Sequence, residues 1–152
     1  MKENVCILIP TLNEVHTIAS VVEKFKALGF NDILVIDGNS TDGTREVAVK
    51  AGANVVIQRG KGKGRALQQA FEIIEKDVIV LIDGDGTYEP EDAERLLAPI
   101  LSGDADHVIG NRFANYEAGA FTRLNLFGNR MLNKIFGLGY GVWLNDILSG
   151  YR

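Results

Sequence analysis

The chain of 152 residues has little cysteine and no long hydrophobic run, and each shortage excludes a class of protein. Its single cysteine, Cys6, cannot support a disulfide framework, and its apolar neighbours are typical of a small core residue in a reducing compartment. No apolar run approaches the roughly 18 residues that a membrane span needs. The first residues also lack the basic and apolar regions of a signal peptide. We therefore expect a chain that neither spans a membrane nor is exported, located in the cytoplasm.

Positive charge is also scarce overall, since the net charge is −4, which argues against a general nucleic-acid binder. Four cations nevertheless crowd into one short segment: Arg59, Lys61, Lys63 and Arg65. The apolar content of 46% is enough to bury one sizeable core in a chain of this length. We expect a single domain spanning residues 1–152, with no nucleic-acid partner.

Apolar runs alternate with helical patterns along the chain. The runs predict strands at residues 5–9, 32–36, 53–57, 78–82 and 107–109. Apolar residues at helical spacing predict helices between them, the first introduced by a capping box of Thr11 and Glu14. Because the strands are apolar throughout, the pattern indicates an α/β fold, a mostly parallel sheet with helices on both faces.

Polar motifs follow most of the predicted strands. They occupy residues 10–14, 37–43, 83–86 and 110–112. Ligands of open parallel sheets bind beyond the carboxyl ends of the strands, so these motifs are expected at one edge. Each also has a structural explanation, because Ser40, Thr41 and Asp42 suit helix caps and Asp37 suits a turn.

Two carboxylates follow the apolar run at residues 78–82. Asp83 and Asp85 lie two positions apart, so an extended backbone would turn both to the same side. Mg²⁺ and Mn²⁺ prefer carboxylate oxygens and share their other positions with water and substrate phosphates. Gly84 between them would allow a bulky anion to approach closely. The alternative is an ordinary turn, for which this composition is also typical.

The segment from Arg59 to Arg65 combines alternate glycines with four cations ahead of a predicted helix. Such a loop would suit a diphosphate, because it offers backbone amides, the positive end of a helix and positive side chains. Its spacing matches neither the P-loop nor the dinucleotide fingerprint. A flexible solvated loop is the alternative.

Together these motifs resemble the ordered motif set of glycosyltransferase family 2, and within it the dolichyl-phosphate (polyprenyl-phosphate) mannosyl- and glucosyltransferase group. The motifs are Pro10-Thr-Leu-Asn-Glu14, Asp37-Gly-Asn-Ser-Thr-Asp-Gly43, Lys61-Gly-Lys-Gly-Arg-Ala66, Asp83-Gly-Asp85, Gly110-Asn-Arg112 and Asp146-Ile-Leu-Ser-Gly-Tyr-Arg152. The resemblance implies a GT-A fold, a nucleotide-diphosphate sugar donor, Mg²⁺ or Mn²⁺, and an inverting, metal-dependent hexosyl transfer.

The resemblance also implies roles for single residues. Those lining the nucleotide pocket would be Pro10, Asn13, Glu14 and Asp37. Asp83 and Asp85 would hold the metal and the diphosphate, with Gly84 between them, and Arg112 would approach phosphate.

The chemistry of the leaving group agrees with these roles. Negative charge grows on a nucleoside diphosphate as it departs, and a bound cation with Lys63 and Arg65 would stabilise it. A sugar hydroxyl acceptor would also need a general base, for which Asp146 is the best placed candidate. A lipid phosphate is already largely anionic at neutral pH, and Asp146 would then orient a loop or the acceptor.

Residues 121–138 read as an amphipathic helix on the acceptor side. At about 100° per residue, Arg123, Arg130 and Lys134 fall within a stripe of about 40°, beside apolar residues. Such a helix could lie on a membrane surface and receive a polyprenyl phosphate through Arg123 and Arg130. In the alternative interpretation, the apolar residues belong to the core and the cations to a solvated face.

Two departures from the resemblance stand out. Thr87 occupies a position where many relatives carry a glutamine that often supplies a third metal ligand. The chain also ends at Arg152, where relatives continue, so we expect a truncated chain. A catalytically incompetent nucleotide-sugar-binding fragment or pseudoenzyme is therefore the alternative to an active transferase. A nucleotidyltransferase is less favoured, because residues 11–14 are not the glycine-rich loop it requires.

Overall fold

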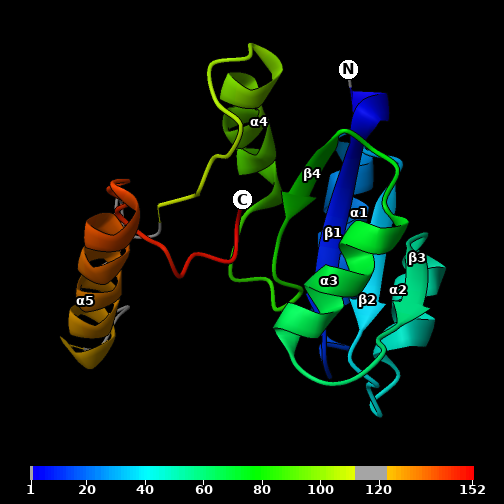
Figure 1. Ribbon diagram of the computed structural model, residues 1–152. Helices are drawn as coiled ribbons and strands as arrows, with labels where there is room; N and C mark the ends of the chain where they lie inside the picture. The colour runs from blue at the N-terminus through cyan, green and yellow to red at the C-terminus, as the bar shows by residue number, and fades with distance from the viewer. Residues whose placement is uncertain (1, 112–122) are drawn as a thin grey trace.

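The structure is a computed structural model that describes residues 2–111 and 123–152, with side chains described at 2–111 and 127–152 (Figure 1). Its parallel strands lie in the order β3-β2-β1-β4. They are β1 (Val5–Thr11), β2 (Ile33–Asp37), β3 (Asn54–Ile57) and β4 (Val78–Leu81). Successive strands are joined through α1 (Ile18–Ala27), α2 (Thr44–Ala51) and α3 (Lys63–Ile73). The predicted α/β fold is confirmed.

The sheet grows in one direction from β1 through β2 to β3, and then in the opposite direction from β1 to β4. Strands β2 and β3 follow on one side of β1, and the crossover through α3 then places β4 on the other side. The register pairs Leu81, the last residue of β4, with Leu8 in the middle of β1. In open parallel sheets, ligands bind outside the carboxyl ends of the strands at such a switch point. The loops that follow β1 and β4 are therefore the first place to look for a site.

Two hydrophobic layers cover the sheet, one on each face. Ile7 and Phe25 are fully buried in the layer between the sheet and α1. Leu8 points to the opposite layer, which α3 covers with Ala70. Cys6 lies in this second layer, where burial raises the pKa of its thiol to about 12. Because both faces are covered, β1 is apolar at nearly every position, as the sequence shows.

The C-terminal residues, rather than residues 107–109, lie beside β4. Leu81 and Arg152 exchange two backbone hydrogen bonds of 2.7 and 3.0 Å, the pattern of an antiparallel pair. Gly110 then donates its backbone N–H to the carbonyl of Tyr151 at 2.9 Å. The predicted strand at residues 107–109 is wrong, because the edge of β4 is taken by a segment from much later in the chain.

The predicted capping box is also wrong. Thr11 is the last residue of β1, and α1 begins only at Ile18. The backbone N–H groups of Thr17 and Ile18 donate to the carbonyl of Glu14 at 3.1 and 3.0 Å, forming a turn before the helix. The Thr11 hydroxyl donates directly to the Glu14 carboxylate. This pair therefore belongs to the loop after β1 and not to a helix terminus.

Two further helices, α4 and α5, follow the sheet in the described chain. Helix α4 (Ala93–Leu101) follows the 3-10 turn η2 (Pro90–Asp92) and buries Leu97 in the same layer as α1. Helix α5 (Arg123–Tyr140) lies to the side of the sheet, beyond α4 (Figure 1). It contains most of the predicted amphipathic helix, while residues 121 and 122 lie outside the described part. Over the described ranges, no helix combines the length and apolarity needed to cross a bilayer.

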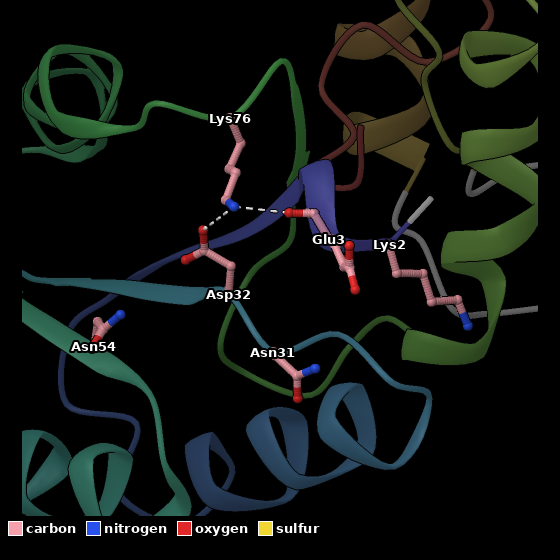
Figure 2. A pocket seen from close by; sticks show the side chains of 6 residues that line it. All are labelled: Lys2, Glu3, Asn31, Asp32, Asn54 and Lys76. Atoms are coloured by element: carbon pink, nitrogen blue, oxygen red, sulfur yellow. Dashed lines mark hydrogen bonds and ion pairs between the residues drawn. The ribbon is translucent and has the colours of Figure 1, made fainter.

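A polar hollow of about 450 Å³ lies at the amino end of the strands (Figure 2). Its lysines have partners: the Lys76 ammonium lies 3.8 Å from the Asp32 carboxylate and donates to the carbonyl of Glu3 at 2.8 Å. Lys2 donates to the carbonyl of Leu28 and pairs with a glutamate of α4. These contacts account for both lysines and for Asp32 without a ligand.

Candidate active site

A cleft of about 500 Å³ lies at the carboxyl end of the strands, where the switch point places it. Loops after all four strands contribute to its walls. The residues predicted for donor binding that line it are Pro10, Glu14, Lys63 and Asp83. Lining residues that were not assigned a role include Leu12, Asn39, Gln58 and Lys61. The cleft thus joins motifs that are up to 73 residues apart in sequence, from Pro10 to Asp83.

Hydrogen bonds lock the loop after β1 to the loop after β2. The backbone N–H of Asn13 donates to the Ser40 hydroxyl at 2.9 Å, and the Asn13 amide oxygen accepts from the backbone N–H of Thr41 at 2.9 Å. The backbone N–H of Glu14 donates to the Thr44 hydroxyl at 2.9 Å. Asn13 has a left-handed φ of 57°, a conformation that asparagine tolerates better than most residues. Asn13 therefore fixes the loop after β1 to the loop after β2, through both its backbone and its side chain.

Asp37 lies under this pair of loops and is fully buried. One carboxylate oxygen accepts the backbone N–H of Ser40 at 2.9 Å and lies 3.6 Å from the Arg45 guanidinium. The other oxygen, Oδ1, has no hydrogen-bond donor among the described residues. A buried carboxylate oxygen without a donor is costly, so this atom suits a donor supplied by a ligand.

Buried glutamines hold the glycine-rich loop after β3. The Gln69 side chain of α3 accepts from the backbone N–H of Arg59 at 2.6 Å and donates to the carbonyl of Ile57 at 3.0 Å. The Gln58 amide donates to the carbonyl of Gly62 at 2.8 Å. The sequence shows glutamines here, but only the structure shows that they are buried. The loop is therefore anchored at both ends, in contrast to a freely solvated one.

The cations of this loop differ in where they point. The Lys63 ammonium, in the first turn of α3, forms an ion pair with the Asp83 carboxylate across the cleft. Arg65 is exposed, lies 3.4 Å from the Gln68 side chain and is not among the residues that line the cleft. Lys63 is thus the cation that the structure brings to the predicted metal carboxylates.

The acidic residues gather where β1 and β4 end. Gly84 is buried, and a Cβ at this position would collide with the Glu14 carboxylate and approach Ile9 Cγ2 to 3.2 Å. The side chain that approaches the Gly84 backbone most closely is therefore that of Glu14. Asp85 is exposed, and its carboxylate accepts the backbone N–H of Thr87 at 2.9 Å, as in an ordinary turn. Among the described residues, no three acidic, histidine or cysteine side chains form a metal-binding group.

Burial raises the pKa of the Glu14 carboxyl group. The hydrogen bond from Thr11 opposes this shift, as does the positive charge of Lys63, whereas the negative charges of Asp85 and Asp83 add to it. The negative charges of both predicted metal carboxylates therefore act on the Glu14 carboxyl group. A cation bound between them would relieve the same repulsion.

The raised pKa of Glu14 predicts a pH dependence of stability. The native state binds this proton more tightly than the unfolded chain, whose glutamates titrate near pH 4.3. The free energy of unfolding should therefore fall as pH rises from that value through the raised pKa of the native state. Glu14→Gln should flatten this part of the profile, measured by urea unfolding between about pH 4 and pH 8 in EDTA. Glu46→Gln, at an exposed position of α2, is the matched control; equal slopes in both variants would contradict the prediction.

The C-terminal motif approaches Asp83 through its glycine. A Cβ on Gly150 would overlap the Asp83 carboxylate, so only a glycine fits there without displacement. The backbone N–H of Gly150 donates to the Tyr88 hydroxyl at 2.7 Å. Neither Tyr88 nor Gly150 was assigned a site role from the sequence, although Tyr88 follows the Asp83 motif and Gly150 lies within the C-terminal motif.

Asp146 lies in the same C-terminal segment but is buried, with a relative exposure of 2%. Its loop is fastened to α5: Asn133 donates to the carbonyl of Asn145 at 2.7 Å and accepts the backbone N–H of Ile147 at 2.9 Å. Arg130 is exposed on α5. Arg112 lies outside the described residues, and the side chain of Arg123 is not described.

The chain belongs to glycosyl transferase family 2, because the model of that family matches residues 6–149. It is similar to the glycosyltransferase AglJ of Haloferax volcanii, with 54% identity over 149 residues, 97% of this chain and 49% of that protein. It is also similar to the low-salt glycan biosynthesis hexosyltransferase Agl6 of the same organism, with 37% identity over 96% of this chain and 37% of that protein. The chain thus spans about half or less of the length of these two relatives.

A solved structure gives the same fold. Glucosyl-3-phosphoglycerate synthase from Mycobacterium tuberculosis, in complex with Mn²⁺ and uridine-diphosphate-glucose, matches with a TM-score of 0.71 and 27% identity over 97% of this chain and 54% of that chain. Its complex with phosphoglyceric acid matches with a TM-score of 0.74 and 25% identity over 97% of this chain and 55% of that chain. The GT-A fold is therefore confirmed. The narrower resemblance to polyprenyl-phosphate transferases stays a prediction.

Proposed function

We propose that this chain is the nucleotide-sugar-binding catalytic domain of an inverting glycosyltransferase that transfers a hexose from a UDP- or GDP-linked donor to a polyprenyl phosphate. One observation carries the proposal: Lys63 and Asp83 face each other across a cleft at the switch point of a parallel sheet. A diphosphate needs this combination, a positive side chain beside carboxylates that can hold a cation. The family and the Mn²⁺ complex of the similar synthase support it.

The carboxylate oxygens at the site suit Mg²⁺ or Mn²⁺ as metal ligands. Asp83 and Asp85 offer carboxylate oxygens, and such cations usually complete their coordination with water and substrate phosphates. Lys63 pairs with Asp83, so a metal that binds this carboxylate would replace the Lys63 ammonium as its counter-ion. Two protein carboxylates would hold the metal, and its charge would neutralise the growing negative charge of the leaving diphosphate.

Asp37 supports recognition of the nucleobase. Its Oδ1 atom lacks a donor among the described residues, and Gly38, next to it in the chain, lines the cleft. Uracil and guanine each carry a ring N–H that a carboxylate oxygen can accept. Pairing with such a base would satisfy the buried Oδ1 atom, while Arg45 lies 3.6 Å from the other carboxylate oxygen.

The remaining residues would assist the transfer by position. The Lys63 ammonium can move from Asp83 to the diphosphate, where charge develops as the sugar bond breaks. A polyprenyl phosphate is largely anionic at neutral pH and does not require a general base. Asp146, buried in the loop that α5 holds, would then orient that loop.

Helix α5 supports a lipid acceptor, because its apolar side chains point outward. Phe127 and Leu138 are 66% and 71% exposed, and Ile135 lies on the same side of the helix. The buried positions from 127 onward are instead the polar Asn129 and Asn133, together with Gly137. An outward apolar face flanked by cations is typical of a helix lying on a membrane, and we propose the cytoplasmic membrane face as the place of action. Arg130 and Lys134, both exposed, are the flanking cations, and Arg112 and Arg123 would also approach phosphate.

Calorimetric titration tests the donor site. UDP and GDP sugars are titrated into the chain with Mn²⁺ and again with EDTA, after circular dichroism has shown that the chain is folded. Binding of one nucleotide that weakens at least about tenfold on chelation is expected. Failure of a folded chain to bind either nucleotide would refute the donor site.

A transfer assay separates the acceptors. Donor with a labelled sugar is offered to polyprenyl phosphate in vesicles, to 3-phosphoglycerate and to a free sugar. Labelled lipid alone is the expected product. Label in phosphoglycerate would support the acceptor class of the structurally similar synthase, and donor binding without any product would support the catalytically incompetent fragment.

A further inference from the structure

We propose that Tyr88 is a positioning residue for the metal-binding carboxylate of Asp83, acting through the backbone of Gly150. This inference rests on the proposed function, since it assigns a support to the metal site. Tyr88 follows the Asp83 to Gly86 loop in sequence, but its hydroxyl binds a segment 62 residues later, accepting the Gly150 N–H at 2.7 Å. Tyr88 therefore connects the metal loop to the C-terminal motif.

The two oxygens of Asp83 have different neighbours. Oδ1 accepts from the Lys63 ammonium, whereas Oδ2 is the atom nearest to the position of a Cβ on Gly150. The carboxylate is thus held between two neighbours, the backbone of Gly150 next to Oδ2 and the Lys63 ammonium on Oδ1. A movement of Gly150 away from Asp83 would allow the carboxylate to rotate, and metal sites bind less tightly when their ligands are not held in place.

The segment around Gly150 is fixed by hydrogen bonds on both sides. Arg152 and Leu81 exchange two backbone hydrogen bonds, which sets the segment beside the strand that leads to Asp83. The Tyr151 hydroxyl donates to the carbonyl of Pro90 at 3.2 Å. The hydrogen bond to Tyr88 is the one that holds the Gly150 amide itself.

The Tyr88 ring is held by packing that does not involve its hydroxyl. It meets the Tyr151 ring edge-on, with centroids 5.6 Å apart and an interplanar angle of 60°, and it lies against the core layer under α1. Tyr88→Phe should keep this packing and remove only the acceptor for Gly150. The substitution therefore tests the hydrogen bond with little disturbance of the fold.

Tyr151→Phe is the matched control. It makes the same chemical change in the neighbouring residue of the same segment, but it removes the bond to Pro90 and leaves Gly150 bound to Tyr88. If anchoring of the whole segment were the role of both hydroxyls, the two variants would behave alike.

The experiment measures Mn²⁺ affinity by titration in the presence of UDP, UDP affinity in EDTA, and hydrogen exchange of the Gly150 amide. In Tyr88→Phe, the Mn²⁺ affinity should fall about tenfold and the Gly150 amide should exchange faster, with UDP affinity in EDTA unchanged. Tyr151→Phe should change Mn²⁺ affinity less than about twofold. Gly150→Ala should weaken Mn²⁺ binding at least as much as Tyr88→Phe, because its Cβ displaces Asp83.

Wild-type Mn²⁺ affinity in Tyr88→Phe, or an equal loss in Tyr151→Phe, would overturn the inference. Failure of the proposed function is seen separately, in the unsubstituted chain: if it binds no Mn²⁺ with either UDP or GDP, the metal site itself is absent and Tyr88 has nothing to position.

Discussion

Asp85→Ala is expected to weaken Mn²⁺-dependent binding of the nucleotide sugar by about 100-fold, which corresponds to about 2.8 kcal/mol at about 1.4 kcal/mol per tenfold. The proposed metal site has two protein carboxylates, and the described part of the chain offers no third acidic, histidine or cysteine ligand to take over. Removing Asp85 leaves one carboxylate, which must serve both the metal and Lys63. The measurement is a titration of the donor at fixed Mn²⁺, compared with the same titration in EDTA.

The expected loss is confined to the metal-dependent part of the affinity. Asp85 is exposed and its carboxylate accepts a hydrogen bond from the nearby Thr87 backbone, so the fold should depend little on it. Asp77→Ala is the matched control, because Asp77 is an exposed aspartate at the other end of β4. Equal affinities of Asp85→Ala and wild type with Mn²⁺ would contradict the metal assignment. Equal losses in both aspartate variants would indicate a general effect of charge.

Local patterns in the sequence were sufficient to predict the layered fold. Continuous apolar runs at β1, β2 and β4 reflect burial on both faces, and this property is visible in the sequence without knowledge of the partners. The prediction of a strand at residues 107–109 was wrong, and the C-terminal residues lie beside β4 instead, because periodicity does not report pairing between segments far apart in the sequence. Backbone hydrogen bonds between Leu81 and Arg152 decide the outcome.

The sequence predicted which residues line the site better than it predicted the contacts that these residues make. Pro10, Glu14, Lys63 and Asp83 lie on one cleft because the carboxyl ends of parallel strands share one edge. Thr11 and Glu14 fitted a helix-capping pattern, yet they bond each other in the site. A capping pattern cannot be distinguished from a loop pattern by spacing alone, since both use the same short polar side chains.

Helix α5 shows a different limit of prediction from sequence. Its apolar periodicity predicted an amphipathic helix but not which face would be covered. In the structure, Asn133 binds the loop around Asp146 through its amide, so the polar face turns inward and Phe127 and Ile135 remain exposed. Hydrogen bonds that join Asn129 and Asn133 to a segment following the helix therefore hold it in this orientation. The spacing of apolar residues along a helix contains no information about such bonds.

Lys63→Met is expected to change the affinities for metal and for nucleotide in opposite directions. In the structure, the Lys63 ammonium is paired with Asp83, the same carboxylate that the metal would use. Removing the ammonium frees Asp83, so Mn²⁺ alone should bind about threefold to tenfold more tightly, a modest gain because both side chains are partly exposed. The nucleotide diphosphate should bind roughly 30-fold more weakly with Mn²⁺ present, since it loses a charge-assisted hydrogen bond.

The opposite signs distinguish two roles for Lys63. If Lys63 only supported the fold of the cleft, its loss would weaken Mn²⁺ and nucleotide binding together. If it serves first as a counter-ion of Asp83 and then as a ligand of the diphosphate, the metal gains and the nucleotide loses. Lys61→Met is the matched control, because Lys61 also lines the cleft but has no ion pair among the described residues. It should leave the affinity for Mn²⁺ alone unchanged and weaken the nucleotide only slightly, and a tighter Mn²⁺ site in Lys61→Met would refute the specific pairing with Asp83.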